Sequence, residues 1–195
     1  MKTFTIVRGL FDTRKRSLMI DKNFIKFENK DHNNDLFSII NKEDIAGIRY
    51  GIHFIRGYRM TIGREYQIFI RDQYGKELKI FFKLFYGRKL NEKHTLYSDI
   101  VDALWEHFIS DLVKNYLEKF RNNEECTIAG IRIFKDRIVF DKKEIALEDI
   151  AIKKYHHHFI IHSKNDHYKN KMLYYLKDKD AVIVLTLLNH ITKNE

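Results

Sequence analysis

The chain contains no proline and a single cysteine, Cys126, among its 195 residues. Without proline it has neither a proline-rich linker nor a polyproline ligand motif. One cysteine cannot form an intramolecular disulfide, which is typical of proteins from a reducing compartment. No apolar run approaches the roughly 18 residues that cross a bilayer, and the N-terminal sequence turns polar before a secretory leader could form. These absences predict a cytoplasmic protein without a transmembrane segment.

Basic residues outnumber acidic ones, with 36 lysines and arginines against 27 aspartates and glutamates. The net charge of +9 is dispersed along the chain, and no run of four or more basic residues occurs. Such a surplus either keeps a protein soluble or attracts an anionic partner, and composition leaves both interpretations open. The aromatic content of 14% argues against a disordered chain.

Three sequence blocks occur twice in the same order, which is the signature of an internal duplication. In the strongest pair, EDIAGIRYGIHFI (43–55) and EDIAIKKYHHHFI (148–160) are identical at eight of thirteen positions. The other two pairs are LMIDKNFIKFENK (18–30) with IRIFKDRIVFDKK (131–143), and SDIVDALWEHF (98–108) with AVIVLTLLNHI (181–191). We therefore expect two copies of one folding plan, with equivalent blocks in equivalent places.

The spacing of the blocks predicts that the second copy is a reduced version of the first. The loop at 29–35 is shortened in the second copy, and the offset between the copies then falls from 105 to 83 residues. The second loss equals about two strands with their turn. The polar stretch 121–125 marks a boundary, which predicts a first domain at 1–121 and a second at 126–195.

Alternating hydrophobicity predicts that most of the chain forms strands. The strands are expected at 3–9, 17–21, 24–28, 36–40, 47–60, 66–71 and 77–86, and then at 127–134, 137–141, 144–147, 150–162 and 168–176. A wide apolar stripe predicts an amphipathic helix at 96–121. Its second half, 108–120, is expected to pack on the second unit or on another subunit.

A family resemblance rests on the segment IFKDRIVFDKKEIALEDIAIKKY (133–155) and its counterpart, LMIDKNFIKFE (18–28) with FSIINKEDIAGIRY (37–50). A strand, a tight turn and a strand ending in an aromatic residue lead through an acidic-Ile step into a long strand. This order resembles bacterial pleckstrin-homology-like and GRAM-like domains over most of residues 15–110 and 130–193. The resemblance implies a mainly β fold with closing helices (α+β): two tandem PH-like β-barrel or half-barrel units, each ended by a C-terminal amphipathic helix, the first of them long.

The resemblance further implies a non-enzymatic binding module, because members of these families contact lipid headgroups, peptides or other subunits. Phosphoinositide-binding relatives carry a long basic loop between their first two strands. The turns taken as equivalent here, 21–23 and 135–137, are short and mixed in charge, which argues against an inositide ligand.

Candidate chemical sites receive little support from the sequence. If 150–162 is one strand, His156, His158 and His162 share a face that could hold a metal, but this spacing does not by itself bring three nitrogens onto one ion. Cys126 follows two glutamates, which disfavour a reactive thiolate. The repeated Glu-Asp pairs at 43–44 and 148–149 fit a turn role. No catalytic motif is present, so we predict no catalytic residue, no metal and no cofactor.

The last two strands of the first unit carry an aromatic and basic face. Even-numbered apolar positions from 68 to 84 are assigned to the core, which leaves the opposite face to Phe69, Arg71, Lys79, Phe81, Lys83 and Phe85. Such a face should not stand freely in water. Cover by the long helix or the second unit, a protein partner, and stacking on single-stranded nucleic acid are three explanations that remain open.

The leading hypothesis is a cytoplasmic adaptor that acts by protein–protein contact or as a homodimer. The alternative is peripheral binding to anionic lipid headgroups through a basic hairpin at 163–171, with Lys164, Lys169 and Lys171 facing the membrane. Binding to single-stranded nucleic acid and a small-molecule or metal-dependent enzyme have less support.

Overall fold

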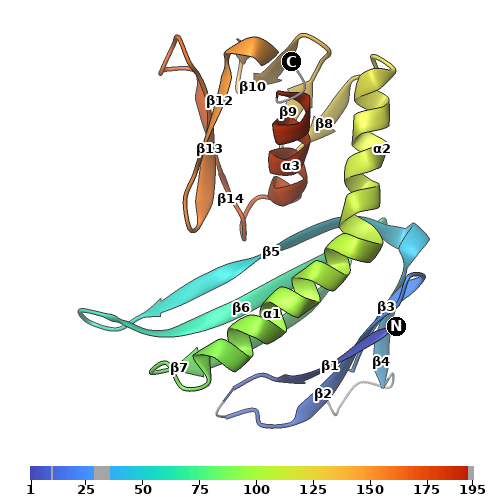
Figure 1. The fold of residues 1–195 in the computed structure, drawn as a ribbon, viewed down its shortest axis with the longest axis vertical. Helices are drawn as coiled ribbons and strands as arrows, with labels where there is room; N and C mark the ends of the chain where they lie inside the picture. The colour runs from blue at the N-terminus through green and yellow to red at the C-terminus, as the bar shows by residue number, and fades with distance from the viewer. Residues whose placement is uncertain (10, 29–35, 193–195) are drawn as a thin grey trace. The chain divides into compact units, whose positions relative to one another are not determined.

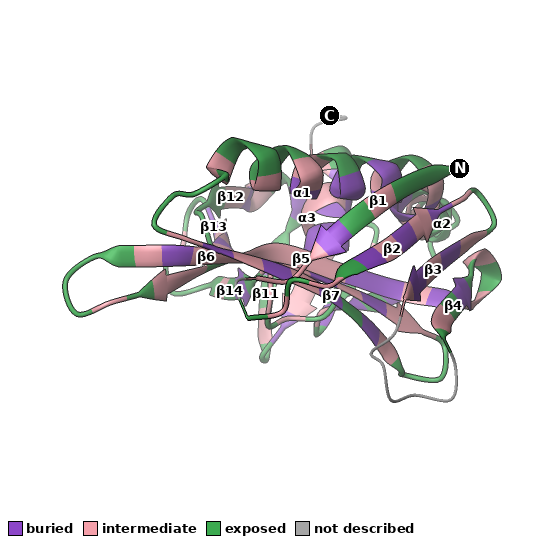
Figure 2. Cartoon of the chain, turned by 90° about the horizontal axis from the view of Figure 1, so that it is seen from below, coloured by how far each residue is buried: buried purple, intermediate pink, exposed green. Residues whose placement is uncertain are grey.

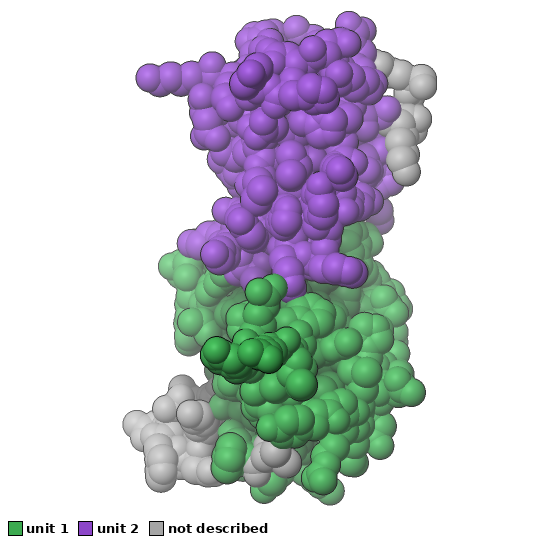
Figure 3. Space-filling view, turned by 90° about the vertical axis from the view of Figure 1, so that its left-hand side faces the viewer, with its two compact units in different colours: residues 1–110 green, residues 111–195 purple. Residues whose placement is uncertain are grey.

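The computed structural model describes residues 1–9, 11–28 and 36–192. The loop at 29–35, which the sequence comparison identifies as longer in the first copy, lies outside the described residues. The chain divides into two compact units, unit 1 at Met1–Ser110 and unit 2 at Asp111–Glu195 (Figure 3). Both units are mainly β and contain helix, as the sequence predicts.

Unit 1 contains two antiparallel sheets followed by a helix (Figure 1). The first sheet has the order β1 (Lys2–Val7), β2 (Lys15–Ile20), β3 (Phe24–Glu28) and β4 (Phe37–Asn41). After a 3-10 turn, η1 (Lys42–Asp44), the second sheet has the order β5 (Ile45–Arg56), β6 (Thr61–Asp72) and β7 (Glu77–Phe85). Helix α1 (Leu90–Leu104) comes next.

Helix α1 packs on one face of the β5–β7 sheet. The ring of Tyr97 lies 5.0 Å from that of Tyr66 and 6.4 Å from that of Tyr50. The even-numbered residues of β7 are buried on this face, as the alternating colours in Figure 2 show. The predicted core face is therefore confirmed, and its buried members are Ile68, Ile70, Leu78, Ile80, Phe82 and Leu84.

The long helix begins at Leu90, earlier than the predicted 96, and contains a π-helical turn, η2 (Trp105–Ile109). Both the N–H and the hydroxyl of Ser110 donate to the carbonyl of Trp105, the hydroxyl at 2.8 Å. The extra residue in this turn rotates the residues after it relative to those before it, and helix α2 (Ser110–Arg121) follows. The two compact units divide within this helix, after Ser110.

Unit 2 repeats the element order of unit 1. Its first sheet has the order β8 (Cys126–Ile128), β9 (Ile131–Ile133), β10 (Arg137–Phe140) and β11 (Lys143–Ala146). A 3-10 turn, η3 (Leu147–Asp149), leads to the sheet of β12 (Ile150–Lys154), β13 (His158–Ser163) and β14 (Asn170–Tyr174). Helix α3 (Ala181–Ile191) closes the unit.

The predicted loss of two strands from the second copy is wrong. Unit 2 keeps the same strands but makes them shorter: β5 and β6 have 12 residues each, whereas β12 has 5 and β13 has 6. Two predicted strands are each divided by a turn. Ala129 and Gly130, with φ of 51° and 71°, separate β8 from β9, and residues 155–157 separate β12 from β13.

The strongest repeated block is structurally equivalent only in its first part. Ile45 and Ile150 begin equivalent strands after equivalent 3-10 turns, and each pairs with the last residue of the next strand, Asp72 or Ser163. Beyond the shared tyrosine the copies diverge, because residues 53–55 continue β5 whereas residues 158–160 begin β13. The three identities in that part therefore do not reflect equivalent positions.

The described strands form four separate sheets that are not closed into barrels, in contrast to the barrel or half-barrel expected from the resemblance. In unit 1 the segment after β1 approaches the edge of the second sheet, where the Lys83 N–H donates to the carbonyl of Arg8 at 2.7 Å. Among the described residues, no helix has the combination of length and apolarity that crossing a bilayer requires.

Candidate functional site

The aromatic and basic face predicted on β6 and β7 lies on the side of the sheet opposite α1. Helix α1 therefore does not cover this face. Arginines of the same unit cover the rings instead: the guanidinium of Arg49 lies 4.2 Å from the ring centre of Phe69, and that of Arg8 lies 4.4 Å from Phe81. Cation–π contacts of this kind stabilise the phenylalanine rings and partly cover them within the unit.

The charges on this face are also engaged locally. Arg49 pairs with Glu77 at 2.8 Å, and Lys83 pairs with Glu65 at 3.0 Å. Arg71 donates to the carbonyl of Ala46 at 3.5 Å. The six predicted residues therefore do not form one open contact surface, although Lys79 is exposed.

The basic hairpin predicted to face lipid has its lysines turned to local partners. Lys171 pairs with Asp141 at 2.9 Å, and Lys164 donates to the carbonyl of Glu148. Lys169 is exposed. Two of the three lysines are thus held by intramolecular contacts.

Asp149 shapes the turn of this hairpin. Its carboxylate accepts hydrogen bonds from the hydroxyl of Ser163 and from the backbone and side-chain N–H groups of Asn165. The equivalent residue in unit 1, Asp44, accepts a bond from the Gln73 side chain at 2.7 Å. The turn role predicted for the repeated Glu-Asp pairs is confirmed for their aspartates.

The three predicted histidines do not all share a strand face, because only His158 and His162 lie on the same side of β13. His156 and His157 lie in the turn between β12 and β13, while His158 begins β13 and stacks on Tyr155 at 4.7 Å. The ring of His162 contacts the carbonyl of Ser163. In the part of the chain that the structure describes, no three histidine, cysteine or acidic side chains are placed to hold a metal ion.

A groove of about 1060 Å³ in unit 1 brings together residues that the sequence analysis treated separately. It lies between β1 and the segment after it, the end of β7, and the beginning of α1. The lining residues are Thr5, Val7, Gly9, Thr13, Lys83, Leu84, Phe85, Tyr86, Arg88, Lys89, Glu92, Lys93 and Leu96. Of the six residues predicted on the aromatic and basic face, only Lys83 and Phe85 line this groove.

The groove combines apolar and cationic residues. Four of its lining residues are basic and one, Glu92, is acidic. Lys89 pairs with Glu92 at 3.2 Å, whereas the Arg88 side chain has no hydrogen-bond or ion-pair partner among the described residues. The ammonium of Lys93 donates to the carbonyl of Val7 at 3.0 Å, and burial together with the charge of Lys89 lowers the pKa of Lys93.

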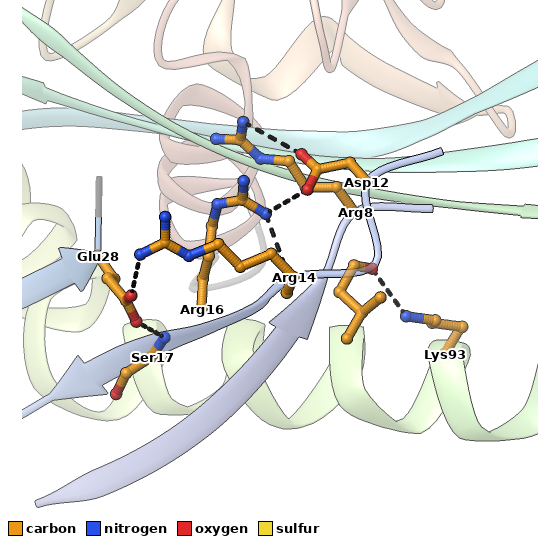
Figure 4. A network of polar contacts seen from close by, with 8 residues as sticks. Arg8, Asp12, Arg14, Arg16, Ser17, Glu28 and Lys93 are labelled. Atoms are coloured by element: carbon orange, nitrogen blue, oxygen red, sulfur yellow. Dashed lines mark hydrogen bonds and ion pairs between the residues drawn. The ribbon is translucent and has the colours of Figure 1, made fainter. Parts of the chain in front are cut away.

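An arginine network fixes one wall of the groove (Figure 4). Arg16 is only 3% exposed, and its guanidinium donates to Asp12 at 2.9 Å. The guanidinium of Arg8 lies 3.9 Å from the same carboxylate. Burial, with a further contribution from the charge of Arg16, lowers the pKa of Arg8. One carboxylate thus serves two cations and holds the segment that contributes Gly9 and Thr13 to the groove.

A second carboxylate extends the network to β3. Glu28 accepts the backbone N–H of Ser17 at 3.0 Å and the guanidinium of Arg14 at 2.7 Å. These two hydrogen bonds lower the pKa of Glu28, the backbone bond having the larger effect. The segment between β1 and β2 is therefore held at both ends by charge-assisted bonds, which are stronger than neutral ones.

The opposite wall contains an unusual turn between β7 and α1. Tyr86, Gly87 and Lys89 have φ of 52°, 66° and 57°, and two of these three are not glycine. Residues other than glycine rarely adopt this conformation, and they do so where surrounding contacts impose it. The turn places Tyr86, Arg88 and Lys89 at the groove.

Sequence reasoning missed most of this site because its residues come from four separate segments. Residues 21–23 join β2 to β3, whereas the connection between the first two strands lies between Val7 and Lys15. The triplet Arg14-Lys15-Arg16 was the available signal for a basic segment there.

No family model, curated protein or solved structure matches this chain.

Proposed function

We propose that the protein is a non-catalytic binding module that captures an acidic segment of a partner protein in the groove of unit 1. The observation that carries the proposal is the groove itself, with its apolar lining and four basic residues. The order of four strands, three strands and a helix, present in both units, supports the resemblance to tandem PH-like domains. Domains of that kind act by binding.

The two strands beside the groove favour an extended protein segment as the ligand. Both β1 and β7 are edge strands of their sheets. An edge strand presents unpaired backbone groups that can hydrogen-bond to an added strand. A bound segment would place apolar side chains against Val7, Phe85 and Leu96, and its carboxylates would reach Arg88 and Lys93. Charge complementarity of this kind sets the choice of partner and the rate of encounter.

Fluorescence anisotropy with a labelled peptide of alternating glutamate and leucine tests this function, with the lysine-leucine peptide as the charge control. We expect the acidic peptide to bind more tightly. Thr5→Trp, at an exposed residue of the groove, should weaken binding about tenfold or more by filling the space. Thr3→Trp, two residues earlier on the same face of β1 and outside the lining, is the matched control.

Reversal of the rim charge is the second arm of the experiment. Arg88→Glu should weaken acidic-peptide binding by up to about thirtyfold, since each exposed charge contact contributes up to about 1 kcal/mol and its reversal about twice that. Absence of acidic-peptide binding, or equal loss in Thr3→Trp and Thr5→Trp, would rule out the groove as the site.

A further inference from the structure

The tip of the β5–β6 hairpin is an exposed feature that the groove does not explain. The last registered pair between β6 and β7 is Gly63 with Phe85, so residues 56–61 extend past the end of β7 (Figures 1 and 2). Tyr58 is 97% exposed and Met60 is 70% exposed. Two large apolar side chains therefore stand in solvent at the end of a projecting hairpin.

The charge around these side chains is entirely positive. From Ile45 to Arg64 the chain contains no acidic residue. Arg56 and Arg59 are both exposed, and neither forms an ion pair or a side-chain hydrogen bond with another described residue. The guanidinium of Arg59 lies 5.6 Å from the ring centre of Tyr58, its own neighbour.

Half-buried apolar residues support the tip from behind. Phe54, Ile55 and Ile62 are neither fully buried nor exposed, and the guanidinium of Arg64 lies 5.2 Å from the ring centre of Phe54. The tip turn is closed by a hydrogen bond from the Gly57 N–H to the carbonyl of Met60 at 2.8 Å. The hairpin thus presents a defined end, with apolar side chains at its point and arginines around them.

We propose that this tip, Arg56–Thr61, inserts Tyr58 and Met60 into the surface of an anionic membrane while Arg56, Arg59 and Arg64 contact the lipid headgroups. Tyrosine suits the membrane interface because its ring is apolar and its hydroxyl is polar. Long cationic side chains keep their charges at the headgroups while their stems lie in apolar surroundings. This membrane contact is separate from the groove and goes beyond the function proposed for it.

The shape of the tip favours a membrane over other anionic partners. A narrow projecting end fits a broad, deformable surface. Single-stranded nucleic acid is bound in grooves that follow the backbone, with successive bases stacked on several aromatic rings, whereas the tip offers one ring. The exposed thioether of Met60 also has its natural environment in the acyl region.

Sedimentation of the full chain with lipid vesicles tests the proposal. The probes are vesicles of phosphatidylcholine alone and of phosphatidylcholine mixed with phosphatidylserine. We expect the protein to bind the mixed vesicles only, and added salt to weaken the binding. Arg56→Gln with Arg59→Gln should lower the partition coefficient more than tenfold, at about fivefold for each arginine. Tyr58→Ser with Met60→Ser should lower it at least as much.

Matched controls lie in the β13–β14 hairpin of unit 2. Tyr168 is 88% exposed, and Lys164 and Lys169 are exposed lysines of the same hairpin. Tyr168→Ser, and Lys164→Gln with Lys169→Gln, should leave binding unchanged within twofold. If these control variants lost vesicle binding as much as the tip variants, the assignment to the β5–β6 tip would be overturned. Vesicle binding that survives the tip substitutions would overturn it as well.

Insertion can be distinguished from purely electrostatic contact. Tyr58→Trp should add fluorescence that brominated lipids quench, measured against the wild-type protein with its own tryptophan as the baseline. No added quenching would overturn insertion. Binding of a labelled single-stranded oligonucleotide that is lost in Tyr58→Ser, with no vesicle binding, would overturn the proposal in favour of nucleic acid. Failure of either kind leaves the peptide-binding test of the groove unaffected.

Discussion

The second sheets of the two units differ in length but share a common beginning. In both units a 3-10 turn ends in aspartate, an isoleucine begins the next strand, and the following strand returns to pair with it. Unit 1 then extends this hairpin to an exposed tip, whereas unit 2 turns at residues 155–157. The shared turn and first strand residues therefore set the fold of both sheets. The additional length of the β5–β6 hairpin is not needed for that fold and is available for binding.

The largest expected effect comes from truncating matched core phenylalanines. Phe82 in unit 1 and Phe159 in unit 2 are both fully buried, and removing either ring should cost about 3–5 kcal/mol of unfolding free energy. Smaller units bury less surface and are closer to instability. Phe159→Ala should therefore unfold unit 2 while unit 1 stays folded, as measured by hydrogen exchange of each unit.

Phe82→Ala is the reciprocal variant and should increase exchange in unit 1. A single cooperative transition that exposes both units equally in both variants would show that the two units do not fold separately.

A smaller effect is expected from the turn aspartates. Asp149→Ala removes the acceptor for Ser163, which is 1% exposed, and for Asn165. An unsatisfied buried donor costs about 1–3 kcal/mol. Asp44→Ala removes the acceptor for the exposed Gln73 side chain and should cost about 1 kcal/mol or less. Chemical denaturation compares the two variants, with the exposed Glu148→Ala as the control. Equal losses for the two aspartates would contradict the difference in burial of their partners.

The repeated tyrosines provide a still smaller contrast. The Tyr50 hydroxyl accepts the indole N–H of Trp105 at 2.8 Å, so Tyr50→Phe should lower the unfolding free energy by about 1 kcal/mol. Its counterpart, Tyr155, is 41% exposed and stacks on His158 through its ring. Tyr155→Phe should therefore leave stability unchanged. If Tyr155→Phe lowered the unfolding free energy as much as Tyr50→Phe does, the hydrogen bond to Trp105 would not explain the difference between the two tyrosines.

The smallest expected effect is a pH dependence of peptide binding in unit 1. Burial and the neighbouring Lys89 lower the pKa of Lys93, so its positive charge is lost as the pH rises through a value below that of an ordinary lysine. The affinity for the acidic peptide should fall over that range, by less than about fivefold for one partly exposed charge. In Lys93→Gln this decline should disappear. A decline of the same size in that variant would assign the titration to another group.

Much of the fold could be predicted from periodicity alone. The alternating core face of β6 and β7, the bounds of β3 and the end of the long helix at Arg121 all follow from which residues must be buried. The π-helical turn could not be foreseen, because it inserts one residue without changing the local composition. The early start of α1 was missed because Leu90 is followed by five polar residues, which carry no apolar period.

The divided strands of unit 2 show a different limit. Gly130, next to Ala129, was a readable turn signal between alternating apolar residues. The turn at 155–157 was not, because Tyr155 and the histidines after it offer none of the usual turn residues. Letter-by-letter identity with 53–55 then favoured one long strand. The groove could not be predicted from the sequence for another reason, because it forms only where β1, β7 and α1 approach one another in space.

The positions of Trp105 and Cys126 give each unit its own natural reporter. The only tryptophan of the chain lies in unit 1, and the only cysteine lies in β8 of unit 2, where burial raises the pKa of its thiol. Indole emission therefore follows one half of the molecule, and the rate of alkylation follows the other. A single unlabelled sample can show which half opens first.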